Sequence, residues 1–214
     1  MKPVFLTATL AGTLLVATVA CTPQPSEPQT SAPVESPTTQ SPSATPEAKP
    51  TLLTYDGPAQ KIPVKAQYPN TMEVSGTGSG EGVGVFFTFK PQANALDEAE
   101  VHVFLPAGVA TAAEQEPFVT GPNGLIANNG WVPDSTQASG SPDFSYPWVE
   151  KIINFSSDKE QSGHVLLGQT NGQAVQVTLL YPAEMADAYW PAANTILDSL
   201  TFEPSLLPVT TSPL

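Results

Sequence analysis

The sequence contains no arginine and only one cysteine among its 214 residues. Without arginine, no guanidinium group is available to bind a phosphate or a carboxylate through two parallel hydrogen bonds. Seven lysines against 20 acidic residues give a formal net charge of −13, which argues against nucleic acid and anionic lipid headgroups as partners. A single cysteine also excludes an intramolecular disulfide and a cysteine-rich metal site.

The one cysteine, Cys21, follows a segment typical of an export signal. The chain begins Met-Lys, residues 3–20 are apolar or small, and the letters TVAC end at the cysteine. This arrangement resembles a bacterial lipoprotein signal. We therefore predict that the signal peptide 1–20 is removed and that Cys21 carries several acyl chains, palmitate among them, which anchor the protein stably. Two alternatives stay open: cleavage by an ordinary signal peptidase, which releases a soluble protein, and a retained transmembrane helix, for which the run is short.

A low-complexity segment follows the anchor. Residues 22–50 contain eight prolines, ten serines or threonines and no aromatic residue. Such a segment cannot bury enough apolar surface to offset its ordering entropy. We predict a lipid anchor and disordered tether over 21–50, a folded head over 51–204 and a flexible tail over 205–214. The tether would hold the head clear of the membrane, facing the periplasm, the cell surface or a thylakoid lumen.

The head is predicted to be an α+β domain with a mainly antiparallel, twisted sheet flanked by helices. Asn171-Gly172 lies between two apolar runs and is typical of a two-residue hairpin turn, which places Thr170 opposite Gln173. Several strands are apolar on both faces, so the sheet needs a cover on each side. The predicted strands are 64–68, 72–76, 83–89, 100–105, 148–155, 164–170 and 173–181.

Two segments have the pattern of helices that would supply these covers. Residues 111–119 begin at Thr111, a plausible cap with a glutamate three residues later, which is the spacing of a capping box. Residues 183–200 carry a broad apolar face. Pro191 interrupts that segment and is expected to kink the helix or to start a second one. A short final strand is predicted at 199–202.

The C-terminal part of the head carries a combination of motifs. Tyr-Pro at 181–182 ends a predicted strand, an amphipathic helix follows, and Ser-Leu-Thr-Phe at 199–202 closes the domain. With an early Tyr-Pro at 68–69 and the order of elements, this resembles the PsbP-like family, the α/β/α sandwich of the extrinsic photosystem II subunit and of the bacterial lipoprotein DcrB. The family's tryptophan after the early Tyr-Pro is replaced here by Thr-Met at 71–72. The resemblance implies a non-enzymatic accessory role at a membrane protein complex, and none of the family's metal-binding or docking residues maps onto this chain.

Five glycines alternate with other residues over 76–84. The run matches neither of the two common phosphate-binding glycine patterns, and its one charged residue, Glu81, would repel phosphate. We predict a flexible hairpin connection. If the run were extended, all five glycines would share one face and would let a backbone or an aromatic ring approach closely.

Two histidines are the only imidazoles of the chain. Glu100 and His102 fall on one face of a predicted strand and are two candidate ligands for a divalent metal, but a structural zinc site normally needs four. The alternative is a half-covered strand face, and we predict neither metal nor cofactor. His164 is expected to be a hydrogen-bonded histidine on an edge strand.

Nucleophilic catalysis finds little support in the sequence. No G-x-S-x-G motif is present, and the only thiol is assigned to the anchor. The acidic pairs Glu114/Glu116 and Asp158/Glu160 are interpreted as solvated surface. We therefore predict no catalytic residues and no enzyme activity.

The segment 130–148 is the predicted binding surface. It is long and polar, and long loops inside a compact domain are often functional. Its aromatic side chains belong to the types enriched in binding hot spots. In the alternative interpretation these rings pin the loop to the sheet. The candidate residues are Trp131, Phe144, Tyr146 and Trp148.

These observations favour an exported, lipid-anchored binding or assembly module. Its predicted partners are the membrane, through the lipid on Cys21, and a membrane protein complex. Nucleic acid is not expected. The alternative is a ligand- or glycan-binding lipoprotein that uses the aromatic loop 130–148. A hydrolase is the third and weakest hypothesis.

Overall fold

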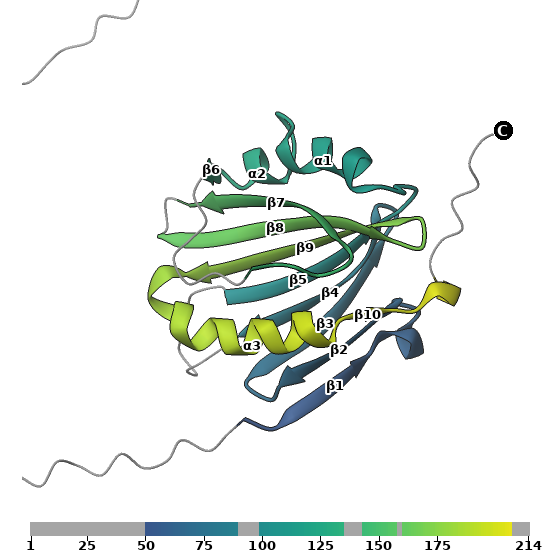
Figure 1. Ribbon diagram of the computed structural model, residues 1–214, viewed down its shortest axis with the longest axis vertical. Helices are drawn as coiled ribbons and strands as arrows, with labels where there is room; N and C mark the ends of the chain where they lie inside the picture. Colours follow the sequence, from purple (N-terminus) through teal and green to yellow (C-terminus); the bar gives the residue numbers. More distant parts are fainter. Residues whose placement is uncertain (1–49, 90–98, 135–142, 158–159, 207–214) are drawn as a thin grey trace, which may run out of the picture. The chain divides into compact units, whose positions relative to one another are not determined.

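The computed structural model describes residues 50–89, 99–134, 143–157 and 160–206 (Figure 1). They belong to one compact unit, Glu47–Leu214. The predicted signal peptide, Cys21 and nearly all of the tether lie outside the described residues, as does most of the tail. No helix in these four described stretches is long and apolar enough to span a membrane.

Two antiparallel sheets form the core of this unit. The larger has seven strands in the order β3-β4-β5-β9-β8-β7-β6, and the smaller has three in the order β1-β2-β10. The strands of the larger sheet are β3 (Met72–Ser79), β4 (Gly82–Phe89), β5 (Ala99–Pro106), β6 (Val132–Asp134), β7 (Val149–Ser156), β8 (Gln161–Thr170) and β9 (Gln173–Pro182). The strands of the smaller sheet are β1 (Leu52–Asp56), β2 (Val64–Pro69) and β10 (Thr201–Phe202).

The hairpin between β8 and β9 is confirmed at the predicted turn. Asn171 and Gly172 both have positive φ, 48° and 76°, as a two-residue turn of this kind requires. Thr170 pairs with Gln173, and the register continues unbroken to Gln161 and Pro182. Every residue of β9 is buried, because β9 lies between β5 and β8 and is covered on both faces.

One face of the large sheet packs against α3 (Ala186–Ser199) and the small sheet. Figure 1 shows α3 lying across the large sheet, and α3 also packs on β2. The hydroxyl of Ser199 accepts a hydrogen bond of 2.7 Å from the Gln67 backbone N–H. The apolar cluster on this face draws on β4, β5 and β9, including Val85, Val103 and Val177.

The opposite face is covered over β7, β8 and β9 by α1 (Ala112–Thr120) and the single turn α2 (Leu125–Asn128). Thr111 and Glu114 form the predicted capping box at the start of α1. The cluster beneath the two helices includes Val119, Val165 and Leu167. The prediction of a sheet with a cover on each face is therefore confirmed.

Several details differ from the predictions. Pro191 neither breaks α3 nor starts a second helix, because Trp190, Ala193 and Ile196 on both sides of it are held in the core. The small sheet was not predicted as a separate sheet, and β1 was missed. The short helices η1 (Gly57–Gln60) and η3 (Pro204–Leu206) were missed as well, whereas η2 (Ala183–Met185) lies inside the predicted helical segment 183–200.

The glycine run is a hairpin made of strands rather than a flexible connection. Its residues belong to β3 and β4, which turn at Gly80-Glu81 and pair from Ser79–Gly82 onward. The five glycines do not share a face. Gly76 pairs with Val85 on the side of α3, whereas Gly84 faces the His102 ring on the opposite side.

Candidate functional site

The helices α1 and α2 leave the β4–β5 half of their face of the sheet less covered. Along β5, Val101, Val103 and Leu105 are buried in the cluster beneath α3, as the alternation predicted. Glu100, His102 and Phe104 point the other way and are half-buried. Here the sheet and the α1–α2 segment enclose a groove.

The groove consists of two adjoining hollows with volumes of about 350 Å³ and 510 Å³. His102 and Leu125 line both hollows, so they mark the boundary between them. These volumes fall within the range of roughly 300–1,000 Å³ that small-molecule pockets occupy. We refer to the two hollows together as the α1–α2 groove.

The floor of the groove is built from cross-strand rows. Phe86 of β4, His102 of β5 and Thr178 of β9 are direct partners in neighbouring strands and form one row. Phe104 and Gln176 pair in the next row. Directly paired residues of antiparallel strands project from the same face, so the strand register alone brings these four side chains and His102 together.

His102 lies at the centre of this floor. Its ring stacks on Phe86, with centroids 3.8 Å apart and planes 8° apart. Burial lowers the pKa of His102 to about 4, so the ring is neutral at pH 7. Within the described residues its Nε2 atom is buried and has no hydrogen-bond partner. Gly84 makes room for this ring, because a Cβ atom there would lie 3.0 Å from Nε2.

Three buried side chains form a hydrogen-bonded chain beside His102, which we call the amide relay. Gln115 of α1 donates from Nε2 to Gln176 Oε1 at 2.8 Å, and Gln176 donates from Nε2 to Thr178 Oγ1 at 3.3 Å. Gln115 is only 4% exposed, and its Oε1 atom finds no partner in the part of the chain that the structure describes. The relay therefore ends in an unsatisfied acceptor at the groove.

Apolar side chains form the walls. Phe118 of α1 is 64% exposed and lines the larger hollow with Phe104. Trp131 lines the smaller hollow and stacks on Phe155, with centroids 4.0 Å apart. The groove thus combines aromatic surface with uncharged hydrogen-bonding groups, which is typical of a small-molecule site.

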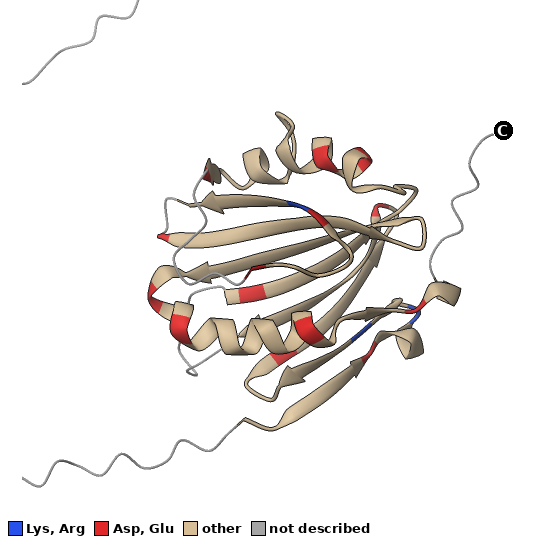
Figure 2. Ribbon diagram, in the orientation of Figure 1, with Lys and Arg blue, Asp and Glu red and all other residues tan. Residues whose placement is uncertain are grey.

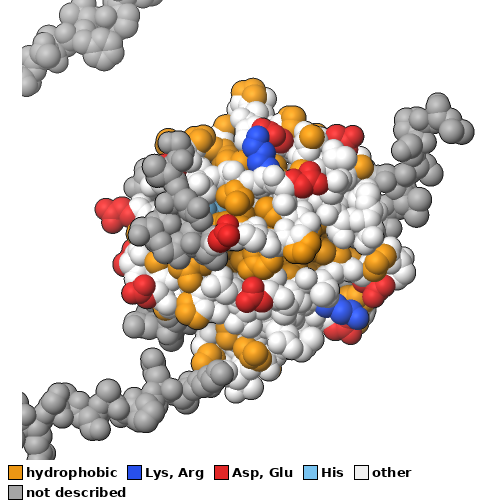
Figure 3. Space-filling view, in the orientation of Figure 1, with side chains coloured by type: hydrophobic (Ala, Val, Ile, Leu, Met, Phe, Trp, Pro, Cys, Tyr) orange, Lys and Arg blue, Asp and Glu red, His pale blue; other side chains and the backbone are white. Residues whose placement is uncertain are grey.

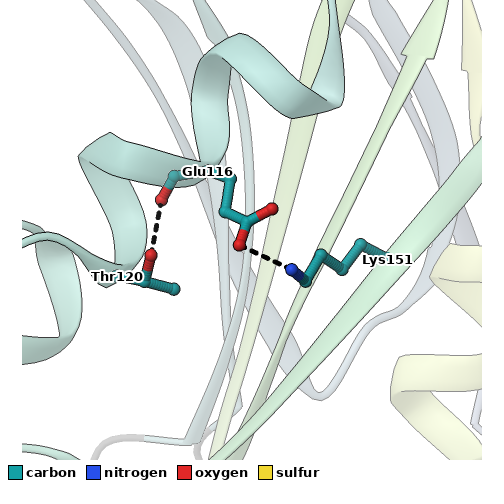
Figure 4. A network of polar contacts seen from close by, with 3 residues as sticks. All are labelled: Glu116, Thr120 and Lys151. Atoms are coloured by element: carbon teal, nitrogen blue, oxygen red, sulfur yellow. Dashed lines mark hydrogen bonds and ion pairs between the residues drawn. The ribbon is translucent and has the colours of Figure 1, made fainter.

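The position of α1 determines where Gln115 and Phe118 lie. Lys151 of β7 forms an ion pair with Glu116 of α1, and Thr120 donates to the Glu116 carbonyl oxygen at 3.1 Å (Figure 4). Both charged side chains are partly exposed, so the pair stabilises little by itself. It does join the helix to the sheet next to the groove.

The electrostatic character of the groove follows from its composition. Among its described lining residues only Glu81 and Glu100 are charged, and neither hollow has a lysine among them. Figures 2 and 3 show that basic residues are sparse over the described part, whereas acidic residues are widely scattered. An anionic ligand would therefore meet no compensating charge among the described residues of the groove.

The four predicted aromatic residues do not form one surface. Trp131 packs with the cluster beneath α1 and α2, whereas the other three belong to the cluster beneath α3. Phe144 is buried and contacts the rings of His164 and Trp190. Only Trp131 therefore lines the groove, and residues 135–142 of the predicted loop lie outside the described residues.

Tyr146 and Trp148 serve mainly to hold the loop against the domain. Their rings stack with centroids 6.2 Å apart, and Trp148 meets Phe202 edge-on. Tyr146 donates to Asp198 of α3 at 3.0 Å. Burial and this contact with Asp198 raise the pKa of the Tyr146 hydroxyl. This is the pinning role that the sequence left open as an alternative.

The metal candidates Glu100 and His102 both line the smaller hollow. No group of three or more histidine, cysteine or acidic residues converges among the residues that the structure describes. Two ligands are too few for the four of a structural zinc site. Asp97 and Glu98, just upstream, fall outside the described stretches.

The prediction of an edge position for His164 is wrong. His164 lies in β8, which is flanked by β7 and β9, and its side chain is completely buried. Its Nδ1 atom lies 2.9 Å from Asn154 Oδ1. The strand at 148–155 was predicted, but its pairing along the outer side of β8 was not.

The described members of the two acidic pairs, Glu114, Glu116 and Glu160, do not line the groove. Glu114 accepts hydrogen bonds from the backbone of Ala110 and Thr111, and Glu116 binds Lys151. Neither Glu114 nor Glu116 lines either hollow. Glu160 follows the undescribed Asp158, and it too lines neither hollow.

Four residues of the groove were not predicted from the sequence: Gln115, Gln176, Thr178 and Phe118. Gln176 and Thr178 stand in a predicted strand, where polar residues between valines were visible but had no assigned partner. Gln115 comes from a segment some 60 positions away, and only the folded arrangement brings it within 2.8 Å of Gln176.

No protein-family model matches this chain, and no curated protein matches it in sequence.

Proposed function

We propose that the chain is a binding module that holds an uncharged small molecule in the α1–α2 groove. The observation that carries this proposal is a pair of buried atoms, Gln115 Oε1 and His102 Nε2, which have no hydrogen-bond partner among the described residues and belong to side chains that line an aromatic-walled hollow. A buried polar atom without a partner costs about 1–3 kcal/mol. A bound ligand that hydrogen-bonds to these atoms offsets this cost.

The proposal includes a place in the cell. Export and lipidation at Cys21, followed by the proline-rich tether, would hold the groove at a membrane surface, facing the periplasm, the cell surface or a thylakoid lumen. The sequence TVAC and the composition of residues 22–50 support it.

A PsbP-like accessory role at a membrane protein complex is the second candidate. It is supported by the order of elements at the C-terminal end, where β9 ends in Tyr181-Pro182 and leads through α3 to β10. Helices on both faces of an antiparallel sheet agree with such a sandwich at the level of fold. This support concerns architecture alone, and the groove favours the first proposal.

Small molecules that co-purify with the full chain test the binding proposal. Wild-type protein and the Phe118→Ala and Gln115→Leu variants would be purified from the same membranes, and their extracts compared by mass spectrometry. Ile152→Ala is the matched control, because Ile152 is an exposed apolar residue that lines neither hollow. The proposal requires a compound retained by wild type and by the control but depleted at least fivefold from both groove variants. Identical extracts from all four proteins would contradict it.

A further inference from the structure

We propose that the α1–α2 groove recognises a neutral sugar, with one pyranose ring in the larger hollow. This inference rests on the proposed function and specifies the chemistry of its ligand. Three independent properties of the groove point to it: its charge, the reversibility of its amide relay and its exposed aromatic walls.

The charge of the groove disfavours ligands with acidic groups. Among the described lining residues only Glu81 and Glu100 are charged, and His102 is neutral at pH 7. A phosphate or carboxylate brought here would lose its hydration without gaining a cationic partner, which is strongly unfavourable. An uncharged ligand avoids this penalty.

The amide relay fits a ligand made of hydroxyl groups. As arranged, the relay ends in an acceptor, Gln115 Oε1. The Thr178 hydroxyl can donate as well as accept. Both glutamine amides can therefore flip, which reverses the direction of every hydrogen bond in the relay. Gln115 would then present its NH₂ group to the groove. A sugar hydroxyl is both donor and acceptor, so it satisfies the relay in either direction.

The neutral imidazole offers a second polar contact. His102 Nε2 is buried without a partner among the described residues, and it accepts or donates according to the tautomer. His102 lines both hollows. A second hydroxyl of the same ligand, or one of a linked second ring, would therefore lie next to the imidazole, and a small rotation of the ring would bring Nε2 to it.

The aromatic walls complement the apolar face of a sugar ring. Phe104 and the 64% exposed Phe118 line the larger hollow beside Gln115 and Gln176, and Trp131 lines the smaller one. Since the two hollows adjoin at His102 and Leu125, a disaccharide can span both. We therefore expect disaccharides to bind more tightly than single sugars.

The test is binding by the full chain in a polyoxyethylene detergent that contains no sugar. Methyl β-glucopyranoside, cellobiose and maltose serve as neutral probes, glucuronic acid and choline as charged probes, and indole as a neutral probe that is not a sugar. Saturation-transfer NMR measures each affinity. We expect at least one disaccharide to bind saturably, at least threefold more tightly than the methyl glycoside and at least tenfold more tightly than glucuronic acid.

Substitutions then locate the binding. Gln115→Leu should weaken disaccharide binding at least fivefold, and Phe118→Ala at least threefold, whereas Gln169→Leu, the same chemical change at an exposed position, should leave it unchanged. Phe118 is exposed, so its variant keeps the test valid if Gln115→Leu does not fold. Unaltered binding in both groove variants would overturn the inference.

The other probes separate the inference from the proposed function. If indole binds, is displaced by no sugar and is lost in Phe118→Ala, the groove binds ligands but the sugar assignment is wrong. Tighter binding of choline than of every sugar would also overturn it and would indicate a cationic ligand. If no probe binds and no compound co-purifies, both proposals fail.

Discussion

The imidazole of His102 lies flat against the phenyl ring of Phe86, with 3.8 Å between the ring centroids and 8° between the planes. Both residues belong to one cross-strand row of the groove floor. The ring is thus held by stacking rather than by a hydrogen bond at its buried Nε2 atom. The ring therefore contributes to stability through stacking, whereas Nε2 is free to contribute to ligand binding.

Replacement of His102 by phenylalanine should lower ligand affinity without lowering stability. The His102→Phe variant keeps an aromatic ring on Phe86 and removes a buried nitrogen that lacks a partner. We expect the free energy of unfolding to stay equal or to rise by up to about 1 kcal/mol, while ligand affinity falls. Urea unfolding and titration with the ligand measure the two effects. A loss of stability above about 1 kcal/mol would show that Nε2 is already satisfied in the unliganded domain.

The second histidine should control how stability depends on pH. Burial lowers the pKa of His164 to about 4, against an ordinary value of 6.5. The unfolded chain therefore binds a proton more readily than the folded one between these values, so stability is lost as pH falls from about 6.5 to 4. The loss attributable to this group reaches about 3 kcal/mol.

The measurement is the slope of unfolding free energy against pH, compared between wild type and His164→Gln. The variant lacks the titrating ring and should lose less stability over this interval, whatever its absolute stability at pH 7. Burial also lowers the pKa of His102 to about 4, but this residue is present in both proteins and its contribution cancels in the comparison. Parallel slopes would mean that His164 is protonated without penalty in the folded state.

Gly168 should tolerate no side chain. A Cβ atom at this position would overlap the carbonyl oxygen of Trp148, which accepts a hydrogen bond from Gln169 N–H at 3.1 Å. We expect Gly168→Ala to lower the free energy of unfolding by about 3 kcal/mol. Gly80→Ala is the control, because no atom lies within 4 Å of a Cβ placed there. Equal unfolding midpoints for the two variants would show that the β7–β8 approach relaxes freely.

The anchor proposal has a direct test at Cys21. Replacing the only thiol of the chain by serine in Cys21→Ser should abolish labelling with radioactive palmitate and move the protein from the membrane fraction to the soluble one. Thr22→Ser, a conservative change at the next residue, should leave both properties unaltered. Labelling that persists in Cys21→Ser would exclude this residue as the attachment point.

Much of the large sheet could be predicted, because its strands carry local signals. Asn171-Gly172 fixed one hairpin and its register, and the alternation along β5 correctly placed Val103 on one face and His102 on the other. The small sheet was harder to predict: β1 and β10 are short, and both pair with β2 although β10 lies far from it in sequence. The prediction that Pro191 could divide the helix was wrong, because core packing of Trp190 and Ile196 outweighs one lost backbone hydrogen bond.

The site was less predictable than the fold. Trp131 was found because of its residue type, but Phe144 carries the same kind of signal and is buried on the opposite side of the sheet. Gln115 looked like an ordinary polar residue of a surface helix. Its role depends on contact with Gln176, and a contact between distant segments leaves no trace in either segment alone.

The alternation of core-facing and groove-facing side chains along β5 and β9 also limits how this groove can evolve. His102 and Gln176 face the groove, while their neighbours Val103 and Val177 lie in the core, so a one-residue slip would exchange the two sets. An insertion or deletion within either strand would therefore destroy the domain before it reshaped the groove. New ligand preferences can arise by substitution in these strands, whereas changes of length are confined to the turns and to the α1–α2 segment.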